Sequence, residues 1–343
     1  MRGKFVEARA AEAYDASEKS DRRFGMKFLA AALILLLLEP VLAQDSYRQA
    51  AKHYDYDART PIDIKEISVQ DRAGVKIHDI TYASPMGGVV PAYLVVPKGK
   101  GKFAAILWGH WMMPKSPTAN RSEFLDEAVA MAPAGVVSLL IDAPYVRPGF
   151  KQDPNPLGAQ DSEVTQQEVI DLRRGIDLLL ARSDVDAKRV AFVGHSFDAE
   201  CGAILDAVDK RPAAFVFMGN PVAVRELVLS SNLPDIVQFR KSVPMDKLKA
   251  YLDANSWTDP GTYAAHLGPA PAFFQYATHD EFVPVDAAKH FFESSSGPKQ
   301  MKFYDSTHAL NAQARRDRYE FLRKHLALPA LPPGSLEKVP QTK

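Results

Sequence analysis

The stretch Arg189-Val-Ala-Phe-Val-Gly194-His195-Ser196-Phe197-Asp198 decides the fold of this chain. A short apolar run, typical of a strand buried on both faces, ends in Gly-x-Ser, and a helical pattern begins directly after the serine. This order predicts a nucleophile elbow, a tight strand-to-helix turn that holds a serine hydroxyl above the edge of a sheet. The free N–H groups and dipole at the start of that helix also favour developing negative charge. Ser196 is therefore the candidate nucleophile.

The segments around the elbow alternate between apolar runs and helical patterns. Short apolar runs predict buried strands at 103–107, 136–141, 190–193, 213–218, 272–277 and 301–304. Helical periodicity is found at 121–131, 161–182, 197–208, 285–292 and 310–325. This alternation predicts an α/β fold with a mostly parallel central sheet and helices on both faces. Antiparallel strands are expected to open it, at 64–70, 75–83 and 88–97.

One long connection stands out in this pattern. Residues 221–269 are too many for a plain loop, and prolines interrupt their helical periodicity. We therefore expect a helical cap, inserted before the strand that begins at 272.

The composition is that of an ordinary globular protein and excludes several other classes. The 42 basic and 42 acidic residues balance, so the basic excess of a nucleic-acid-binding protein is absent. The single cysteine, Cys201, cannot form an internal disulfide. The sequence has no Gly-rich phosphate loop, dinucleotide fingerprint or His-Glu-x-x-His motif. We therefore expect chemistry that needs neither a metal ion nor another cofactor.

The amino-terminal part has the layout of an export signal. Met26-Lys27 leads into the eleven-residue apolar run 28–38, and the small residues that a signal peptidase accepts end at Ala43. The run is shorter than the about 20 apolar residues of a membrane-spanning helix. The pattern predicts a cleaved signal peptide over 26–43 and a secreted or periplasmic protein without a stable membrane span. A retained anchor and a cytosolic leader are the alternatives.

This signal divides the chain into three parts. Residues 1–25 precede a signal of usual layout and are interpreted as an over-extended start. Residues 44–343 are expected to form a single domain that includes the cap at 221–269.

A serine nucleophile needs a general base and a carboxylate that orients the base. In this architecture an acid and then a histidine follow the serine along the chain. The strand at 272–277 leads into Thr-His-Asp280-Glu-Phe-Val-Pro, and the strand at 301–304 leads into Asp305-Ser-Thr-His308. Both segments follow the carboxyl end of a strand, where parallel-sheet enzymes collect catalytic groups.

The elbow segment 184–196, Asp-Val-Asp-Ala-Lys-Arg-Val-Ala-Phe-Val-Gly-His-Ser, together with these two strand ends, resembles the α/β-hydrolase superfamily. Within it, the chain is similar to the dienelactone hydrolase, acetyl xylan esterase and prolyl oligopeptidase-like group over roughly residues 75–325. The resemblance implies that Ser196 is the nucleophile and that His308 is the general base and then acid. Asp280 would fix the imidazole tautomer and stabilise its cation.

Three other side chains near these positions allow further interpretations. Asp305 is a competing candidate for the acid, because it lies close to His308 in the sequence. His195 and His279 are interpreted as structural neighbours of the site rather than participants.

The resemblance also implies where the tetrahedral oxyanion would bind, which needs two backbone N–H groups. Phe197, the residue after the nucleophile, would supply one of them. Aligning the loop Trp108-Gly-His110 with the family's His-Gly-x pattern assigns the other to His110, and a shift of one or two residues would assign it to Trp111 or Met112. Trp108, Trp111 and Met112 are also candidates for the wall of the substrate pocket.

Asp198 departs from the family pattern, which has glycine two residues after the serine. An aspartate in the first turn of a helix interacts favourably with the helix dipole, which predicts a structural role. A carboxylate at this position would, however, oppose the negative charge that develops in the oxyanion site.

Together these features predict an exported serine hydrolase that cleaves small carboxylic esters through an acyl-enzyme intermediate. An oligopeptidase-like peptidase would use the same triad, but that branch usually carries a large amino-terminal propeller. In the expected mature chain, which begins at 44, only about 60 residues precede the first parallel strand. The other alternative is a non-catalytic member of the fold that binds a ligand beneath the cap. The sequence leaves open the acyl and alcohol preference and the oligomeric state.

Overall fold

The computed structural model describes residues 46–72, 74–113 and 115–341. Its contacts divide the chain into two units, Met1–Ala50 and Ala51–Lys343, and the sheet belongs to the second unit. The leader and the signal peptide lie outside the described residues, so their assignment stays a prediction. Among the described residues, no helix combines the length and the apolar character needed to cross a membrane.

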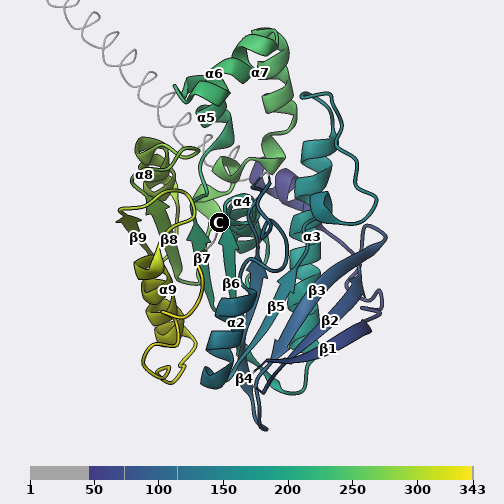
Figure 1. The fold of residues 1–343 in the computed structure, drawn as a ribbon. Coiled ribbons are helices and arrows are strands. Elements are labelled where there is room, and N and C mark those ends of the chain that lie inside the picture. Colours follow the sequence, from purple (N-terminus) through teal and green to yellow (C-terminus); the bar gives the residue numbers. More distant parts are fainter. Residues whose placement is uncertain (1–45, 73, 114, 342–343) are drawn as a thin grey trace, which may run out of the picture. The chain divides into compact units, whose positions relative to one another are not determined.

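Within the described residues, a nine-stranded sheet forms the centre of the fold, in the order β1-β2-β3-β5-β4-β6-β7-β8-β9 (Figure 1). Its strands are β1 Lys65–Arg72, β2 Val75–Ala83, β3 Val89–Val96, β4 Phe103–Gly109, β5 Val136–Ile141, β6 Val185–His195, β7 Ala214–Met218, β8 Ala272–Ala277 and β9 Lys299–Tyr304. The pairs β1–β2, β2–β3 and β3–β5 are antiparallel. The remaining neighbours in this sheet pair in parallel. This confirms the predicted mostly parallel sheet with antiparallel opening strands.

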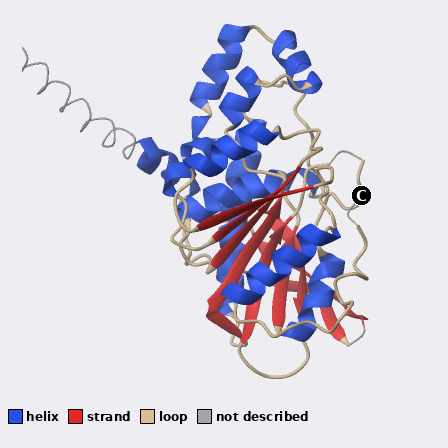
Figure 2. Ribbon diagram, turned by 90° about the vertical axis from the view of Figure 1, so that its left-hand side faces the viewer, coloured by secondary structure: helices blue, strands red, loops and turns tan. Residues whose placement is uncertain are grey.

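Helices cover both faces of this sheet (Figure 2). They are α2 Leu125–Met131, α3 Gln160–Ala181, α4 Phe197–Val208, α5 Val224–Ser230, α6 Pro234–Ser242, α7 Met245–Ala254, α8 Val285–Ser294 and α9 Ala312–His325. Short 3-10 turns lie at Lys52–Tyr54, Ala132–Ala134, Pro144–Val146, Ser256–Thr258, Pro260–Thr262 and Ala264–His266.

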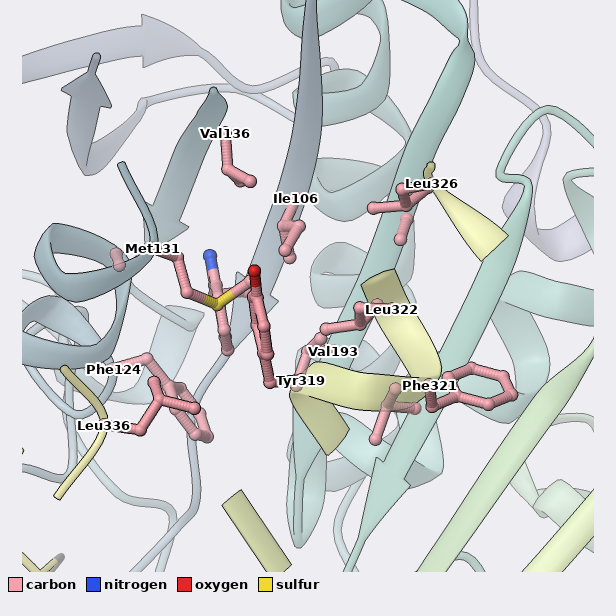
Figure 3. Close-up of a cluster of buried hydrophobic side chains, with 14 of the residues drawn as sticks. Ile106, Phe124, Met131, Val136, Val193, Tyr319, Phe321, Leu322, Leu326 and Leu336 are labelled. Atoms are coloured by element: carbon pink, nitrogen blue, oxygen red, sulfur yellow. The ribbon is translucent and has the colours of Figure 1, made fainter. Parts of the chain in front are cut away.

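Alternate residues of the central strands face opposite helices, because successive side chains of a strand point to opposite faces of a sheet. Ile106 of β4 and Val193 of β6 pack in one buried cluster with Met131 of α2 and Leu322 of α9 (Figure 3). On the other face α4 approaches the sheet so closely that a Cβ on Gly202 would lie 2.2 Å from the Phe192 ring. Burial on both faces explains why these strands are uninterrupted apolar runs in the sequence.

The connection between β7 and β8 holds α5, α6 and α7, which extend beyond the sheet (Figure 1). Side chains of all three helices line one cavity with Phe197, the first residue of α4. The inserted helices therefore stand over the carboxyl end of β6, which confirms the predicted helical insertion before β8.

Candidate active site

Ser196 occupies a sharp turn between β6 and α4. Its backbone has φ 55° and ψ −113°, a conformation that is costly for a residue other than glycine and that is found at functional sites. The turn is tight because a Cβ on Gly194 would lie 2.3 Å from the backbone oxygen of Asp198. The N–H of Ser196 donates to the carbonyl of Met218 at 2.8 Å, which ties the turn to the end of β7. This geometry is that of the predicted nucleophile elbow.

Asp280 and His308 form a buried pair at the ends of β8 and β9. His308 Nδ1 lies 2.9 Å from Asp280 Oδ2 and 3.0 Å from Oδ1, and both side chains are 1% exposed. The N–H groups of Phe282 and Val283 donate to Oδ1 and hold the carboxylate in place. A carboxylate only accepts hydrogen bonds, so Nδ1 carries a proton. The remaining nitrogen, Nε2, is buried and has no hydrogen-bond partner among the described residues.

The His308 ring lies against the strand ends that carry the elbow. A Cβ on Gly219, the residue after Met218, would be 2.9 Å from His308 Cε1. On another side the ring stacks on His195, the residue before Ser196, with centroids 5.2 Å apart. The structure thus brings the Asp280–His308 pair next to the elbow, although the described contacts include no hydrogen bond between Ser196 Oγ and His308 Nε2. Catalytic hydrogen bonds are often long without substrate and tighten when it binds.

Asp305, the competing candidate for the acid, lies on the surface and pairs with a histidine other than His308. Its carboxylate accepts a hydrogen bond from His279 Nε2 at 2.9 Å, and the two side chains are 93% and 69% exposed. The geometry therefore favours Asp280 as the partner of His308.

Two backbone N–H groups at the site are free to bind an oxyanion. The N–H of Phe197 begins α4, where helix N–H groups have no acceptor within the helix. In the loop after β4, the N–H of Trp111 donates to Glu123 Oε2 at 2.8 Å, and the N–H of His110 lies close enough to the Asp198 carboxyl to lower its pKa. The role of the His110 N–H in the oxyanion site stays a prediction. Among the described residues, the Met112 N–H donates to no acceptor.

The direction of the Met112 N–H is fixed by two hydrogen bonds to the preceding carbonyl. His110 Nε2 accepts from the Ala143 N–H at 3.0 Å, so the other ring nitrogen carries the proton and donates to Trp111 O, also at 3.0 Å. Burial lowers the pKa of His110 to about 4, which keeps the ring neutral. Tyr145 Oη donates to the same carbonyl at 2.9 Å. Because C=O and N–H point in opposite directions in a trans peptide, clamping Trp111 O also orients the Met112 N–H.

Asp198 is buried beneath this loop and not in contact with solvent. Its side chain fills the space beside Gly109, where an added Cβ would lie 2.5 Å from Asp198 Cβ. Burial raises the pKa of Asp198 well above its usual range, and the neighbouring Glu168 carboxylate raises it further. The pair therefore keeps a proton at neutral pH, which weakens the objection that Asp198 opposes the oxyanion. Among the described residues, no group of three acidic, His or Cys side chains could hold a metal ion.

Met112, Phe197 and the inserted helices line a cavity of about 340 Å³. The apolar side chains that α5 to α7 contribute to it are Val224, Val228, Phe239, Leu248 and Leu252. Glu200 of α4 also reaches it, and burial raises the pKa of this carboxyl to about 7.

Of the three candidates for the wall of the substrate pocket, Met112 lines this cavity, whereas Trp108 and Trp111 do not. Trp108 faces the α2 side of the sheet and stacks on Phe124, with ring centroids 5.0 Å apart. Trp111 is turned inward by its N–H bond to Glu123 and stacks on His195. Both indoles are almost completely buried.

The sequence did not single out Glu123 or Tyr145 as members of the site. Glu123 falls in a helical pattern that carries several charges, and Tyr145 stands in a Pro-containing loop. No local motif marks either residue, because each acts through contacts with segments distant in the sequence.

Three comparisons relate the chain to known proteins. A family model described as PhoPQ-activated pathogenicity-related protein matches residues 235–336, which include Asp280 and His308 but not Ser196. No curated protein matches the chain. Solved structures match most of it, among them an acetyl xylan esterase from Paenibacillus sp. R4, with 19% identity and a TM-score of 0.65.

Acetyl xylan esterase 1 from Thermoanaerobacterium sp. JW/SL YS485 matches with 14% identity and a TM-score of 0.67. Each of these two matches covers 82% of this chain and 93% of the other. A glucuronoyl esterase from Solibacter usitatus matches with 15% identity and a TM-score of 0.55, over 82% of this chain and 91% of its own. At these identities the similarity concerns the fold.

Proposed function

On the premise that this chain has the α/β-hydrolase fold, shared with acetyl xylan esterases, we propose that it is a serine hydrolase that cleaves carboxylic esters. The observation that carries the proposal is the buried Asp280–His308 pair beside the elbow that presents Ser196. The pair holds a proton on Nδ1 and leaves Nε2 available as a base. Fold alone does not define an activity, so the argument rests on these three side chains.

The proposed reaction has two halves. Ser196 Oγ attacks the ester carbonyl while His308 Nε2 takes the hydroxyl proton, and Asp280 stabilises the imidazolium that forms. The N–H groups of Phe197 and Met112 bind the oxyanion of the tetrahedral intermediate. Collapse of the intermediate transfers the proton from His308 to the departing alcohol and leaves an acyl-enzyme. Water, deprotonated by the same nitrogen, then releases the acid and restores Ser196.

The cavity beneath the inserted helices indicates which kind of substrate group the site would accept. Met112 and Phe197, the residues of the two proposed oxyanion donors, both line it, so a group attached to the ester carbonyl would enter it. The mostly apolar wall favours an acyl or alcohol group with apolar surface. In this proposal residues 221–269 act as a cap, and ester cleavage is preferred over peptide cleavage because the named structural neighbours are esterases. Export through the signal at 26–43 is part of the same proposal.

Labelling with a fluorophosphonate tests the proposal without knowledge of the substrate, because this reagent phosphonylates an activated serine. We expect a covalent adduct, located by peptide mass spectrometry on Ser196. Hydrolysis of p-nitrophenyl esters from acetyl to dodecanoyl would then define the acyl preference. A chain that binds ligands without catalysis would stay unlabelled and would hydrolyse none of these esters.

A Tyr145→Phe variant tests the assignment of the Met112 N–H to the oxyanion site. The change removes one of the two donors that hold Trp111 O, and we expect kcat to fall about tenfold with KM unchanged, because the affected N–H acts mainly in the transition state. Tyr82→Phe is a matched control, since the hydroxyl of Tyr82 is also buried and donates to the carbonyl of Asp171, away from the site. Steady-state kinetics on one ester should show the loss in the first variant only. Equal kinetics of the two variants would exclude a role for the Tyr145 hydroxyl in orienting the Met112 N–H.

A further inference from the structure

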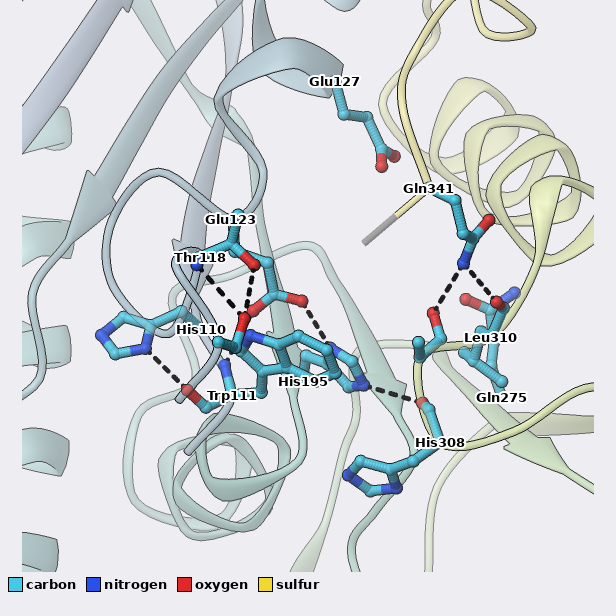
Figure 4. A network of polar contacts seen from close by, with 12 residues as sticks. His110, Trp111, Thr118, Glu123, Glu127, His195, Gln275, His308, Leu310 and Gln341 are labelled. Atoms are coloured by element: carbon cyan, nitrogen blue, oxygen red, sulfur yellow. Dashed lines mark hydrogen bonds and ion pairs between the residues drawn. The ribbon is translucent and has the colours of Figure 1, made fainter. Parts of the chain in front are cut away.

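One buried carboxylate links two segments of the site. Glu123 lies just before α2, and its side chain is fully buried. Its Oε2 accepts the N–H of Trp111, in the loop that carries the proposed oxyanion donor. Its Oε1 lies 2.5 Å from Nδ1 of His195, the residue before the nucleophile (Figure 4).

His195 extends this link to the segment of the general base. Its other nitrogen, Nε2, lies 3.0 Å from the backbone oxygen of His308. A carbonyl oxygen only accepts, so Nε2 must carry a proton and donate it. The ring is also held between two others: it stacks on Trp111 at 5.0 Å and on His308 at 5.2 Å between centroids.

The result is a continuous chain of contacts through Trp111, Glu123, His195 and His308. It joins the oxyanion loop after β4, the elbow after β6 and the histidine loop after β9. Burying a carboxylate and an imidazole is expensive, and apolar side chains could fill the same space at lower cost. Packing alone therefore does not account for this pair. The need to fix three separate segments relative to one another explains it.

We propose that Glu123 and His195 are positioning residues that fix the oxyanion loop and His308 relative to Ser196. The proposal rests on the serine hydrolase function proposed above. Neither residue touches the reacting atoms; each acts through the backbone of a neighbouring segment. Catalysis tolerates only small displacements of such groups, so loosening the link should slow the chemical step more than it weakens binding.

The variant Glu123→Gln tests this role. The carboxamide oxygen can still accept from Trp111 N, but the NH₂ group that replaces Oε1 only donates, so the short contact in which the carboxylate accepts from His195 Nδ1 is lost. With a fluorophosphonate probe, we expect the maximal labelling rate constant to fall about 10- to 30-fold and the half-saturating probe concentration to stay within about twofold. The probe reports on Ser196 and His308 directly, whatever the natural substrate is.

Glu127→Gln is a matched control on α2. Glu127 is also a buried carboxylate with both oxygens engaged, at 3.0 and 2.6 Å from Arg318, but its hydrogen bonds and ion pairs to the described residues reach no segment of the proposed site. We expect it to lower Tm and to leave the labelling rate constant unchanged. An equal loss of labelling in both variants would mean that Glu123 only stabilises the fold, and would overturn the proposal.

A second variant, Glu123→Asp, decides the matter if Glu123→Gln does not fold. It keeps the charge beside His195, but it is shorter by one methylene group and cannot span both partners. We expect a smaller loss of the same kind, and an unchanged rate constant in either folded variant would overturn the proposal. Failure of the serine hydrolase function itself would look different, since the wild-type protein would then not be labelled.

Discussion

An Asp280→Asn variant is expected to lose about 10⁴-fold in kcat while remaining folded. The N–H groups of Phe282 and Val283 both donate to Oδ1 of Asp280, so the oxygen of the new carboxamide must face them. The carboxamide NH₂ group then takes the place of Oδ2, 2.9 Å from His308 Nδ1, and can only donate there. This favours the tautomer with the imidazole proton on Nε2, the nitrogen that has to accept the proton of Ser196. The loss should be measured as kcat on a p-nitrophenyl ester, with circular dichroism as the check on folding.

Asp305→Asn is the control for this experiment. Asp305 is an exposed carboxylate that pairs only with His279 among the described residues, so we expect its kcat to stay within about twofold of the wild type. If Asp280→Asn kept most of its activity and Asp305→Asn lost it, the acid would have been assigned to the wrong strand end.

The sequence predicted the fold and the main site candidates for the same physical reason. Strands buried on both faces require uninterrupted apolar runs, so β4 to β8 were recognisable without knowledge of their partners. The elbow adds a local constraint, because the turn at Ser196 leaves room only for glycine at 194. Asp280 and His308 follow strand ends on the same edge of the sheet, so their proximity was predictable from topology. Boundaries were less exact: β6 begins at Val185, well before the predicted run at 190–193.

The parts that could not be predicted depend on backbone direction and on contacts between distant segments. Whether His110 or Met112 offers a free N–H is decided by the Asp198 carboxyl and by Tyr145, and neither position is implied by the loop sequence. Trp111 was expected in the pocket, yet the buried Glu123 draws its backbone inward. Such side chains carry no sequence pattern of their own.

Asp198 illustrates how a departure from a family pattern can be accommodated. Glycine is usual at this position because α4 lies close to the neighbouring loop, and here Gly109 supplies the missing space from the other side. The cost of burying the carboxyl is reduced because its raised pKa favours the neutral form. A neutral acid beneath the loop is compatible with an oxyanion above it, so the departure does not by itself argue against catalysis.

A Gly219→Ala variant is expected to lower kcat about 10- to 100-fold, because the imidazole has to move by several tenths of an ångström and a misplacement of about 1 Å costs about 100-fold. The added Cβ would lie 2.9 Å from Cε1 and 3.1 Å from Nδ1 of His308, closer than such atoms approach, so the imidazole has to move. Asp280 holds the ring at Nδ1, and the displacement therefore changes the direction of Nε2 relative to Ser196.

The backbone cost of this substitution needs its own control, since Gly219 has φ +69°, which disfavours any residue with a Cβ. Gly88 has a similar φ of +77° in the turn between β2 and β3, and an added Cβ there meets nothing within 4 Å. We expect Gly88→Ala to lower Tm by a similar amount and to leave kcat unchanged. If both variants kept wild-type kcat, the position of the His308 ring would not be critical for turnover, which would contradict its assignment as the general base.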